Sequence, residues 1–116
     1  DTWHWVRANQ PIDLSVLKDI PADKIVSIQI NDVWERPYAT PILRDESMHD
    51  RLAPGTGIGC TEAFVRMVKE KGIQPLAIGV EVISDAILAK GLDYAATHTY
   101  ENTRKVLKAA WPEVLS

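Results

Sequence analysis

The sequence predicts an α/β protein in which parallel strands alternate with helices. Two stretches, 24–32 and 76–82, alternate apolar and polar residues with period two, as half-buried strands do. The segments between and after them have helical spacing. Strands that alternate with helices pair in parallel through right-handed crossovers, so helices are expected to cover one face of the sheet.

Each predicted strand has an apolar face and a polar face. The apolar residues of the two strands are Val26, Ile28, Ile30, Leu76, Ile78, Val80 and Val82. The opposite face carries Gln29 in the first strand and Glu81 in the second. Both residues lie near the C-terminal ends of their strands, where barrels of parallel strands hold their chemistry.

Three segments carry helix signals. The segment 61–71 places apolar residues on one face and ends before Gly72, a typical C-terminal cap. A longer helix is predicted from about Asp93 to Trp111, because Pro112 follows it. Asp13 is placed to cap a short helix that ends before Pro21.

Composition excludes several classes of function. The net charge of −3 argues against nucleic acid or an anionic membrane surface as the main partner. No apolar run approaches the ~20 residues of a membrane span. The single cysteine, Cys60, cannot form an internal disulfide and fits a reducing compartment, so we expect a cytoplasmic protein.

The connection 33–59 is unusually long for a compact domain, which favours a functional role. It contains Arg51 and a Pro-Gly-x-Gly turn at 54–57. The turn lacks the Lys-Ser/Thr pair of a phosphate-binding P-loop, so that interpretation is rejected.

Glu81 is the residue that most needs an explanation. A glutamate in an apolar strand must be paired, bound to metal or protonated to offset its desolvation. One interpretation is a salt bridge, for which Arg7 or Arg51 is available. The other is a divalent metal held by oxygens of Asp1, Gln29 and Glu81, a ligand set that suits Mg²⁺ or Mn²⁺ and is also compatible with Zn²⁺ or Co²⁺.

Asp1-x-x-His4 places a second carboxylate beside an imidazole. We expect this pair to enter the same site from a strand end that runs into a loop.

Four motifs in order give the chain a resemblance to the sugar phosphate isomerase/epimerase family, in the xylose isomerase-like TIM-barrel superfamily. They are Asp-Thr-Trp-His at 1–4, Ile-Gln-Ile-Asn-Asp at 28–32, Arg-Leu-Ala-Pro-Gly-Thr-Gly at 51–57 and Gly-Val-Glu-Val at 79–82. The resemblance covers essentially the whole chain. It implies that residues 1–116 are the C-terminal portion of a (β/α)8 barrel, with two to three strands and their covering helices.

The resemblance also implies roles for individual residues. Asp1, Gln29 and Glu81 match metal ligands, and His4 matches a histidine that contacts the substrate. Asp32 and Arg51 match positions that line the substrate pocket, and Arg7 or Arg51 is expected to hold an anionic group. Glu81 and His4 are the expected catalytic residues: Glu81 moves a proton next to a carbonyl, through an enediolate, while His4 polarises the substrate oxygen.

A full barrel takes roughly 250 residues, so the resemblance predicts that the N-terminal half and one metal ligand are missing. We therefore expect the 116 residues alone to be inactive. We also expect them to self-associate, or to pair with the missing half, through exposed strand edges. The expected substrate is a sugar or sugar phosphate.

The sequence has three alternative interpretations besides an isomerase or epimerase. A metal-dependent dehydratase similar to 3-dehydroshikimate dehydratase begins with the same proton abstraction. A non-catalytic barrel remnant that acts as an interaction domain is the second. A DNA-repair endonuclease of the same superfamily is disfavoured, because the stretch 51–54 lacks the histidines that its metal site requires.

Overall fold

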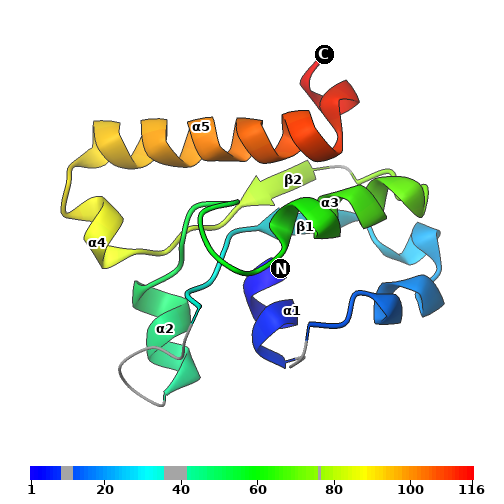
Figure 1. The fold of residues 1–116 in the computed structure, drawn as a ribbon, viewed down its shortest axis with the longest axis horizontal. Helices are drawn as coiled ribbons and strands as arrows, with labels where there is room; N and C mark the ends of the chain where they lie inside the picture. Colours follow the sequence, from blue (N-terminus) through cyan, green and yellow to red (C-terminus); the bar gives the residue numbers. More distant parts are fainter. Residues whose placement is uncertain (9–11, 36–41, 76) are drawn as a thin grey trace.

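Two short parallel strands lie at the centre of the structure, which is a computed structural model described over residues 1–8, 12–35, 42–75 and 77–116 (Figure 1). They are β1 (Ser27–Ile30) and β2 (Ala77–Val80). The α-helices are α1 (Thr2–Ala8), α2 (Leu43–His49), α3 (Thr61–Glu70), α4 (Asp85–Leu88) and α5 (Leu92–Ala110). Short 3₁₀ helices occupy η1 (Ser15–Asp19), η2 (Ala22–Lys24) and η3 (Pro112–Leu115).

The prediction that the chain forms a portion of a (β/α)8 barrel is wrong. Within the described residues, the chain is a small α/β protein with five α-helices and a sheet of only two strands. The parallel pairing itself is confirmed, with a register that runs from Ser27 opposite Ala77 to Ile30 opposite Val80. Local alternation of strand and helix predicts the direction of pairing, but it does not determine how many strands join the sheet or whether the sheet closes.

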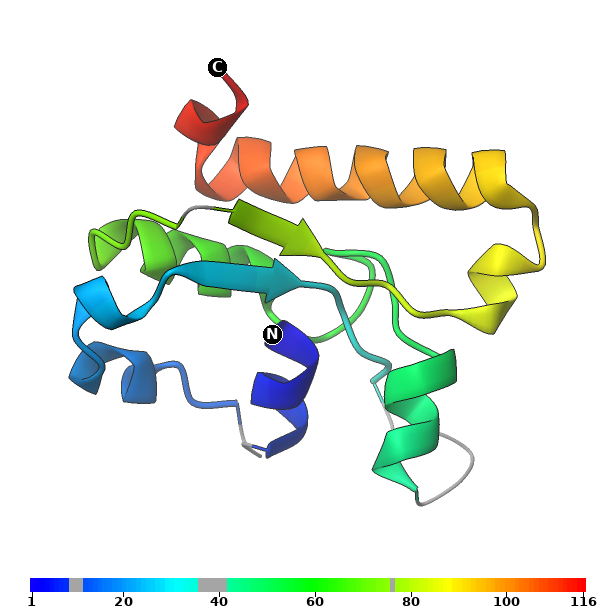
Figure 2. The same ribbon diagram turned by 180° about the vertical axis from the view of Figure 1, so that it is seen from behind.

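The hydrophobic core lies on one face of the sheet. Ile28 and Ile30 are buried there, together with Phe64 and Val65 of α3 and Val106 of α5. Helix α5 packs against α3, and the two views show α3 on one face of the strands and α5 along the β2 side (Figure 2). The predicted alternation of β1 is confirmed, because Ser27 and Gln29 on the other face are exposed.

The second strand is less buried than its pattern predicts. Ile78 is half-buried against the core, but Val80 is 40% exposed. Leu76 lies outside the described residues. Val80 pairs with a fully buried residue, Ile30, so its exposure shows that the helices cover β1 more completely than β2.

The predicted ends of the longer helices are confirmed. Helix α3 ends at Glu70, and Gly72 follows with a φ of +74° that glycine adopts without steric cost. Helix α5 ends at Ala110, and Pro112 begins a new 3₁₀ turn. The short helix after Asp13 is a 3₁₀ turn, in which the Asp13 carboxylate accepts a hydrogen bond from the Ser15 amide at 2.8 Å.

The start of the chain is helical, and the prediction of a strand end and loop there is wrong. Helix α1 follows Asp1 directly, and the Asp1 Oδ1 atom accepts a hydrogen bond from the Trp3 amide at 2.8 Å. A carboxylate in this position satisfies an amide of the first turn that has no partner within the helix. The three-residue spacing therefore places Asp1 and His4 on one side of a helix.

The long connection 33–59 is more structured than a loop. It contains α2, and two antiparallel bridges after this helix join Leu52 to Asp32 and Asp50 to Ser84. Gly57 lies so close to this chain crossing that an added Cβ would come within 2.0 Å of the Val33 carbonyl oxygen. Glycine is therefore required at this position.

None of the described helices has the length and apolar character needed to cross a membrane.

The uneven burial of the two strands predicts an uneven response to mutation. We expect Ile30→Ala to reduce the free energy of unfolding by about 2–5 kcal/mol, because it leaves a cavity in a fully packed position. Val80→Ala, at the paired position, is expected to cost less than about 1 kcal/mol. Urea denaturation of both variants measures the difference, and equal losses would contradict the assignment of the core to the β1 side.

Candidate functional site

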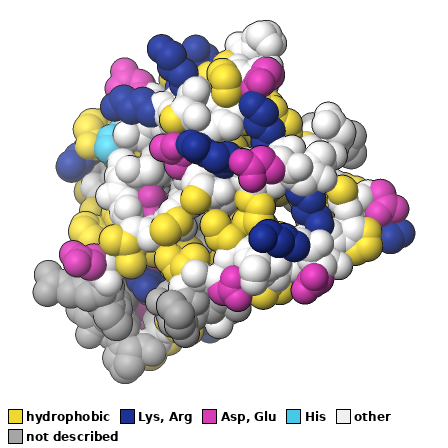
Figure 3. All heavy atoms as spheres, turned by 45° about the vertical axis from the view of Figure 1, so that its right-hand side comes forward, with side chains coloured by type: hydrophobic (Ala, Val, Ile, Leu, Met, Phe, Trp, Pro, Cys, Tyr) yellow, Lys and Arg dark blue, Asp and Glu magenta, His cyan; other side chains and the backbone are white. Residues whose placement is uncertain are grey.

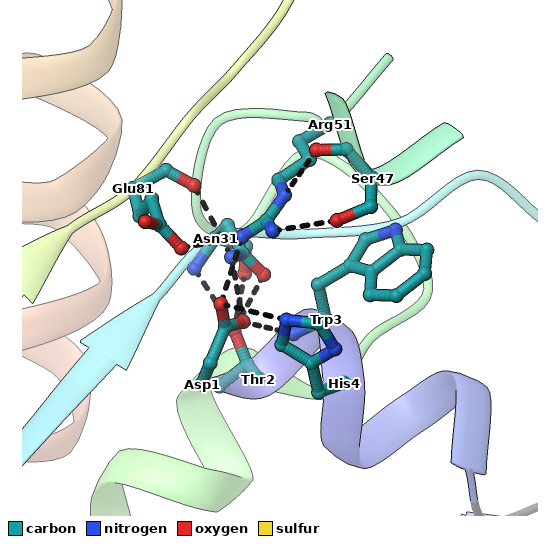
Figure 4. A network of polar contacts seen from close by, with 8 residues as sticks. All are labelled: Asp1, Thr2, Trp3, His4, Asn31, Ser47, Arg51 and Glu81. Carbon is teal, nitrogen blue, oxygen red and sulfur yellow. Dashed lines mark hydrogen bonds and ion pairs between the residues drawn. The ribbon is translucent and has the colours of Figure 1, made fainter. Parts of the chain in front are cut away.

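Four polar side chains from separate segments meet where the two strands end (Figure 4). Asp1 precedes α1, Asn31 follows β1, Arg51 follows α2 and Glu81 follows β2. Parallel strands end at the same edge of a sheet, which explains why residues 50 positions apart in sequence come together here. Thus Asp1 and Glu81, both predicted as site residues, are brought into one cluster.

Arg51 lies at the centre of this cluster and is buried, with 3% of its side chain exposed. Its Nη1 atom donates to Asp1 Oδ2 and to Glu81 Oε2, each at 2.8 Å. Its Nε and Nη2 atoms donate to the carbonyl oxygen and the hydroxyl of Ser47, at 2.7 and 2.8 Å. The guanidinium carbon also lies 5.5 Å from the centre of the Trp3 ring.

These contacts decide between the two arginines considered for Glu81. Arg51 forms the ion pair, and Arg7 does not contribute to it. Two carboxylates share one guanidinium. Because both carboxylate oxygens contact the same nitrogen, they also lie close to each other.

The two carboxylates differ in their access to solvent. The Asp1 side chain is 8% exposed, and its second oxygen, Oδ1, accepts hydrogen bonds from the Trp3 amide and from Asn31 Nδ2. The Glu81 side chain is 37% exposed. Glu81 is therefore the carboxylate of this cluster that a molecule in solution reaches more easily.

His4 lies at the rim of the cluster. Its Nε2 atom is 3.7 Å from Asp1 Oδ2, and its side chain is largely exposed. Partial desolvation lowers the pKa of His4 below its ordinary value of 6.5, and the positive charge of Arg51 lowers it further. At neutral pH the ring is therefore uncharged and has a nitrogen that accepts a proton.

Gln29 and Asp32 have different surroundings. Gln29 is exposed on the sheet face that also carries Asn31, opposite Gly79 in the neighbouring strand. Asp32 is buried, and its Oδ1 atom accepts hydrogen bonds from the amides of Val33 and Gly59 at 2.8 and 2.6 Å. The Asp32 carboxylate thus joins the two ends of the long connection, Val33 and Gly59.

Arg7, expected to hold an anionic group, forms an ion pair of its own. Its Nε atom lies 3.1 Å from both carboxylate oxygens of Glu46, which is buried in α2, and its Nη2 atom donates to the Trp34 carbonyl oxygen at 3.3 Å. This pair joins α1 to α2. Its guanidinium is engaged there, outside the Arg51 cluster.

Sequence reasoning did not single out Ser47 and Asn31 as site residues. Ser47 precedes Arg51 by four residues within a connection read as a loop, so no helical spacing was expected to link them. Asn31 had a detectable signal, because it follows Gln29 by two residues and faces Glu81 when the two strands pair in parallel.

No protein-family model matches the chain, and no curated protein matches it either. Within the described part of the chain, no group of three or more His, Cys, Asp or Glu side chains is arranged to hold a metal ion. The third ligand expected from the sequence is an amide, Gln29, which such a group does not include.

Removal of the central charge is expected to destabilise the fold. Arg51→Met leaves Asp1 and Glu81 facing each other without a counter-charge, so we expect a loss on the order of 3 kcal/mol in the free energy of unfolding. Arg51→Lys keeps the charge but not the planar fork, and an intermediate loss is expected. Arg66→Met, in the exposed pair with Glu62, serves as the control and should cost less than about 0.5 kcal/mol. A similar loss for the Arg51→Met and Arg66→Met variants would show that the Arg51 cluster contributes no special stability.

The titration of His4 reports on the charges around it. We expect its pKa to lie below 6.5 and to fall further in Glu81→Gln, because the negative charge of Glu81 favours the protonated ring. NMR titration of the imidazole resonances measures both values. Glu62→Gln, in the exposed pair on α3, is the matched control and should leave the pKa of His4 unchanged. An unchanged or higher pKa in Glu81→Gln would contradict the proximity of the two side chains.

Proposed function

We propose that the cluster around Asp1 and Glu81 transfers a proton next to the carbonyl group of a sugar-like substrate, with a divalent metal as cofactor. The observation that carries this proposal is the convergence of two carboxylates and an imidazole at the C-terminal ends of parallel strands. Such groups are the usual participants in general acid–base chemistry. The resemblance of the four sequence motifs to sugar phosphate isomerases and epimerases supports the same chemistry.

The donor set of the cluster fits a hard divalent cation. Asp1 and Glu81 direct one oxygen each toward a single cationic nitrogen, and Gln29 lies on the same face of the sheet. Carboxylate and amide oxygens suit Mn²⁺ or Mg²⁺, and Zn²⁺ or Co²⁺ also accept them. Asp1, Glu81 and Gln29 would hold the ion, which would supply electrostatic stabilisation of the negative charge that develops on a substrate oxygen.

The protein's own side chains account for the proton transfer. Glu81 is the more exposed carboxylate and is proposed as the base that removes or returns the proton. His4, uncharged and at the rim, is placed to contact the carbonyl oxygen of the substrate. Asp1 is held by two hydrogen bonds and is proposed to act as a carboxylate of fixed position.

Arg51 is better suited to act as a counter-charge than as a binder of anionic substrates. Its contacts to Asp1, Glu81 and Ser47 occupy most of its hydrogen-bond donors, and two carboxylates already neutralise its charge. We propose that Arg51 keeps the two carboxylates together when no other cation lies between them.

Isomerase, epimerase and dehydratase activities all begin with this proton abstraction. They differ in where the proton returns and in which group leaves, and the cluster does not distinguish them. The choice depends on the substrate, so the test uses a panel of ketoses, inosose-type polyols and dehydroshikimate.

The experiment measures exchange of the substrate α-proton with solvent deuterium, in the protein expressed at its natural length. We expect exchange that depends on Mn²⁺, and a rate at least ~100-fold lower in Glu81→Gln, because the proposed base is removed. Glu62→Gln is the control and should retain the full rate. An exchange rate that is unchanged in Glu81→Gln, or after a chelator removes the metal, would contradict the proposal.

A second candidate function is that of a non-catalytic interaction domain that self-associates. Among the described residues, the outer edge of β2 has no strand partner, and a pocket of mixed polar and apolar character lies beside it, lined by Gln74, Pro75, Ala77, Ile78, Leu107, Trp111 and Val114. Figure 3 shows hydrophobic side chains gathered in the middle of one face, with charged side chains around them. Absence of both exchange and metal binding, together with a dimer in light scattering, would favour this candidate over the enzyme.

A further inference from the structure

Asn31 is completely buried at the point where four segments of the chain meet. Its side chain contacts Asp1 and Thr2 at the start of α1, and Glu81 after β2, and its carbonyl oxygen accepts a hydrogen bond from Thr61 at the start of α3. No role was predicted for Asn31, and the proposed proton transfer does not use it directly.

The side-chain amide of Asn31 links the two carboxylate residues of the cluster. Its Nδ2 atom donates to Asp1 Oδ1 at 2.9 Å and to the main-chain carbonyl oxygen of Glu81 at 3.2 Å. An amide NH₂ group has two hydrogens, and these two acceptors use both. A single side chain therefore holds the Asp1 carboxylate against the backbone from which the Glu81 carboxylate extends.

Thr2 fixes the orientation of this amide. Its Oγ1 atom accepts a hydrogen bond from the Asn31 main-chain amide at 2.9 Å, and its single hydroxyl hydrogen is shared between Asn31 Oδ1 at 2.8 Å and the Asn31 carbonyl oxygen at 3.1 Å. Because Oδ1 faces a donor, Nδ2 must face Asp1 and Glu81. The contact of Oδ1 with Thr2 Oγ1 and the contacts of Nδ2 with Asp1 Oδ1 and the Glu81 carbonyl oxygen set this orientation.

We infer that Asn31 is a positioning residue that sets the placement of the Asp1 and Glu81 carboxylates relative to each other. This inference rests on the proposed function, because placement matters most where both carboxylates bind one cation. Groups that hold a metal ligand in place typically change metal affinity or activity by about 10–100-fold when they are removed. Glutamine, aspartate or alanine at this position would each lack a correctly placed pair of donors.

The first test measures binding of Mn²⁺ alone, by electron paramagnetic resonance, to the wild-type protein and two variants. We expect Asn31→Ala to weaken binding by about 10–100-fold, because Asp1 loses its link to Glu81. Thr61→Val is the matched control: it removes another hydrogen bond to Asn31, at the carbonyl oxygen, but leaves both Nδ2 contacts. Its affinity should equal that of the wild type. Equal weakening in both folded variants would show that Asn31 acts through general stability, and would overturn the inference.

The second test does not depend on metal or on a variant of Asn31. Hydrogen exchange of the Asn31 side-chain amide is followed by NMR in the wild-type protein and in Asp1→Ala. We expect exchange at least ~10-fold faster in the variant, while the side-chain amide of Asn102, which bonds to His98, is unchanged. Unchanged exchange of the Asn31 side-chain amide would overturn the inference. This test remains valid even if the Asn31→Ala variant does not fold. A wild-type protein that binds no Mn²⁺ would contradict the proposed function instead, and the exchange result would still decide the role of Asn31.

Discussion

The buried guanidinium of Arg51 is the interaction on which the arrangement of this protein depends. A charge removed from water costs several kcal/mol unless opposite charges and hydrogen bonds replace its hydration. Arg51 obtains these from three segments, since Asp1 and Glu81 supply the charge and Ser47 supplies two acceptors. The start of α1, the end of β2 and the helix inside the long connection are therefore held at one place.

The two faces of the sheet differ in character, since one is apolar and buried and the other is polar. Ile28 and Ile30 face α3 and α5 and form the core with their apolar side chains. One residue step along the same strand reverses the side-chain direction, so Gln29 and Asn31 lie on the other face. The alternation that builds the core thus also presents polar groups at the strand ends, where Asn31 is buried against Asp1, Thr2 and Glu81 and Gln29 is exposed.

The cluster combines a fixed part with an accessible part. Asn31 and the Trp3 amide hold Asp1, which is nearly buried, whereas Glu81 and His4 face solvent to a greater degree. The proposed proton transfer requires this division, because a group that orients a substrate must be fixed and the group that takes the proton must be accessible. Arg51 balances the two carboxylates, and a divalent cation would compete with it for the same oxygens.

Much of the local structure was determined by the sequence alone. Interactions between residues near in sequence explain the alternation in β1 and the ends of the helices before Gly72 and Pro112. General rules for connections between strands explain the parallel pairing. The two ionic explanations for Glu81 also followed from its place in an apolar strand. Only the tertiary structure decided the remaining features. These are the size of the sheet, the helices α1 and α2, the pairing of Glu81 with Arg51 and not Arg7, and the link through Asn31. Each of these depends on which distant segments share the cost of burying polar groups, and no pattern of neighbouring residues contains that information.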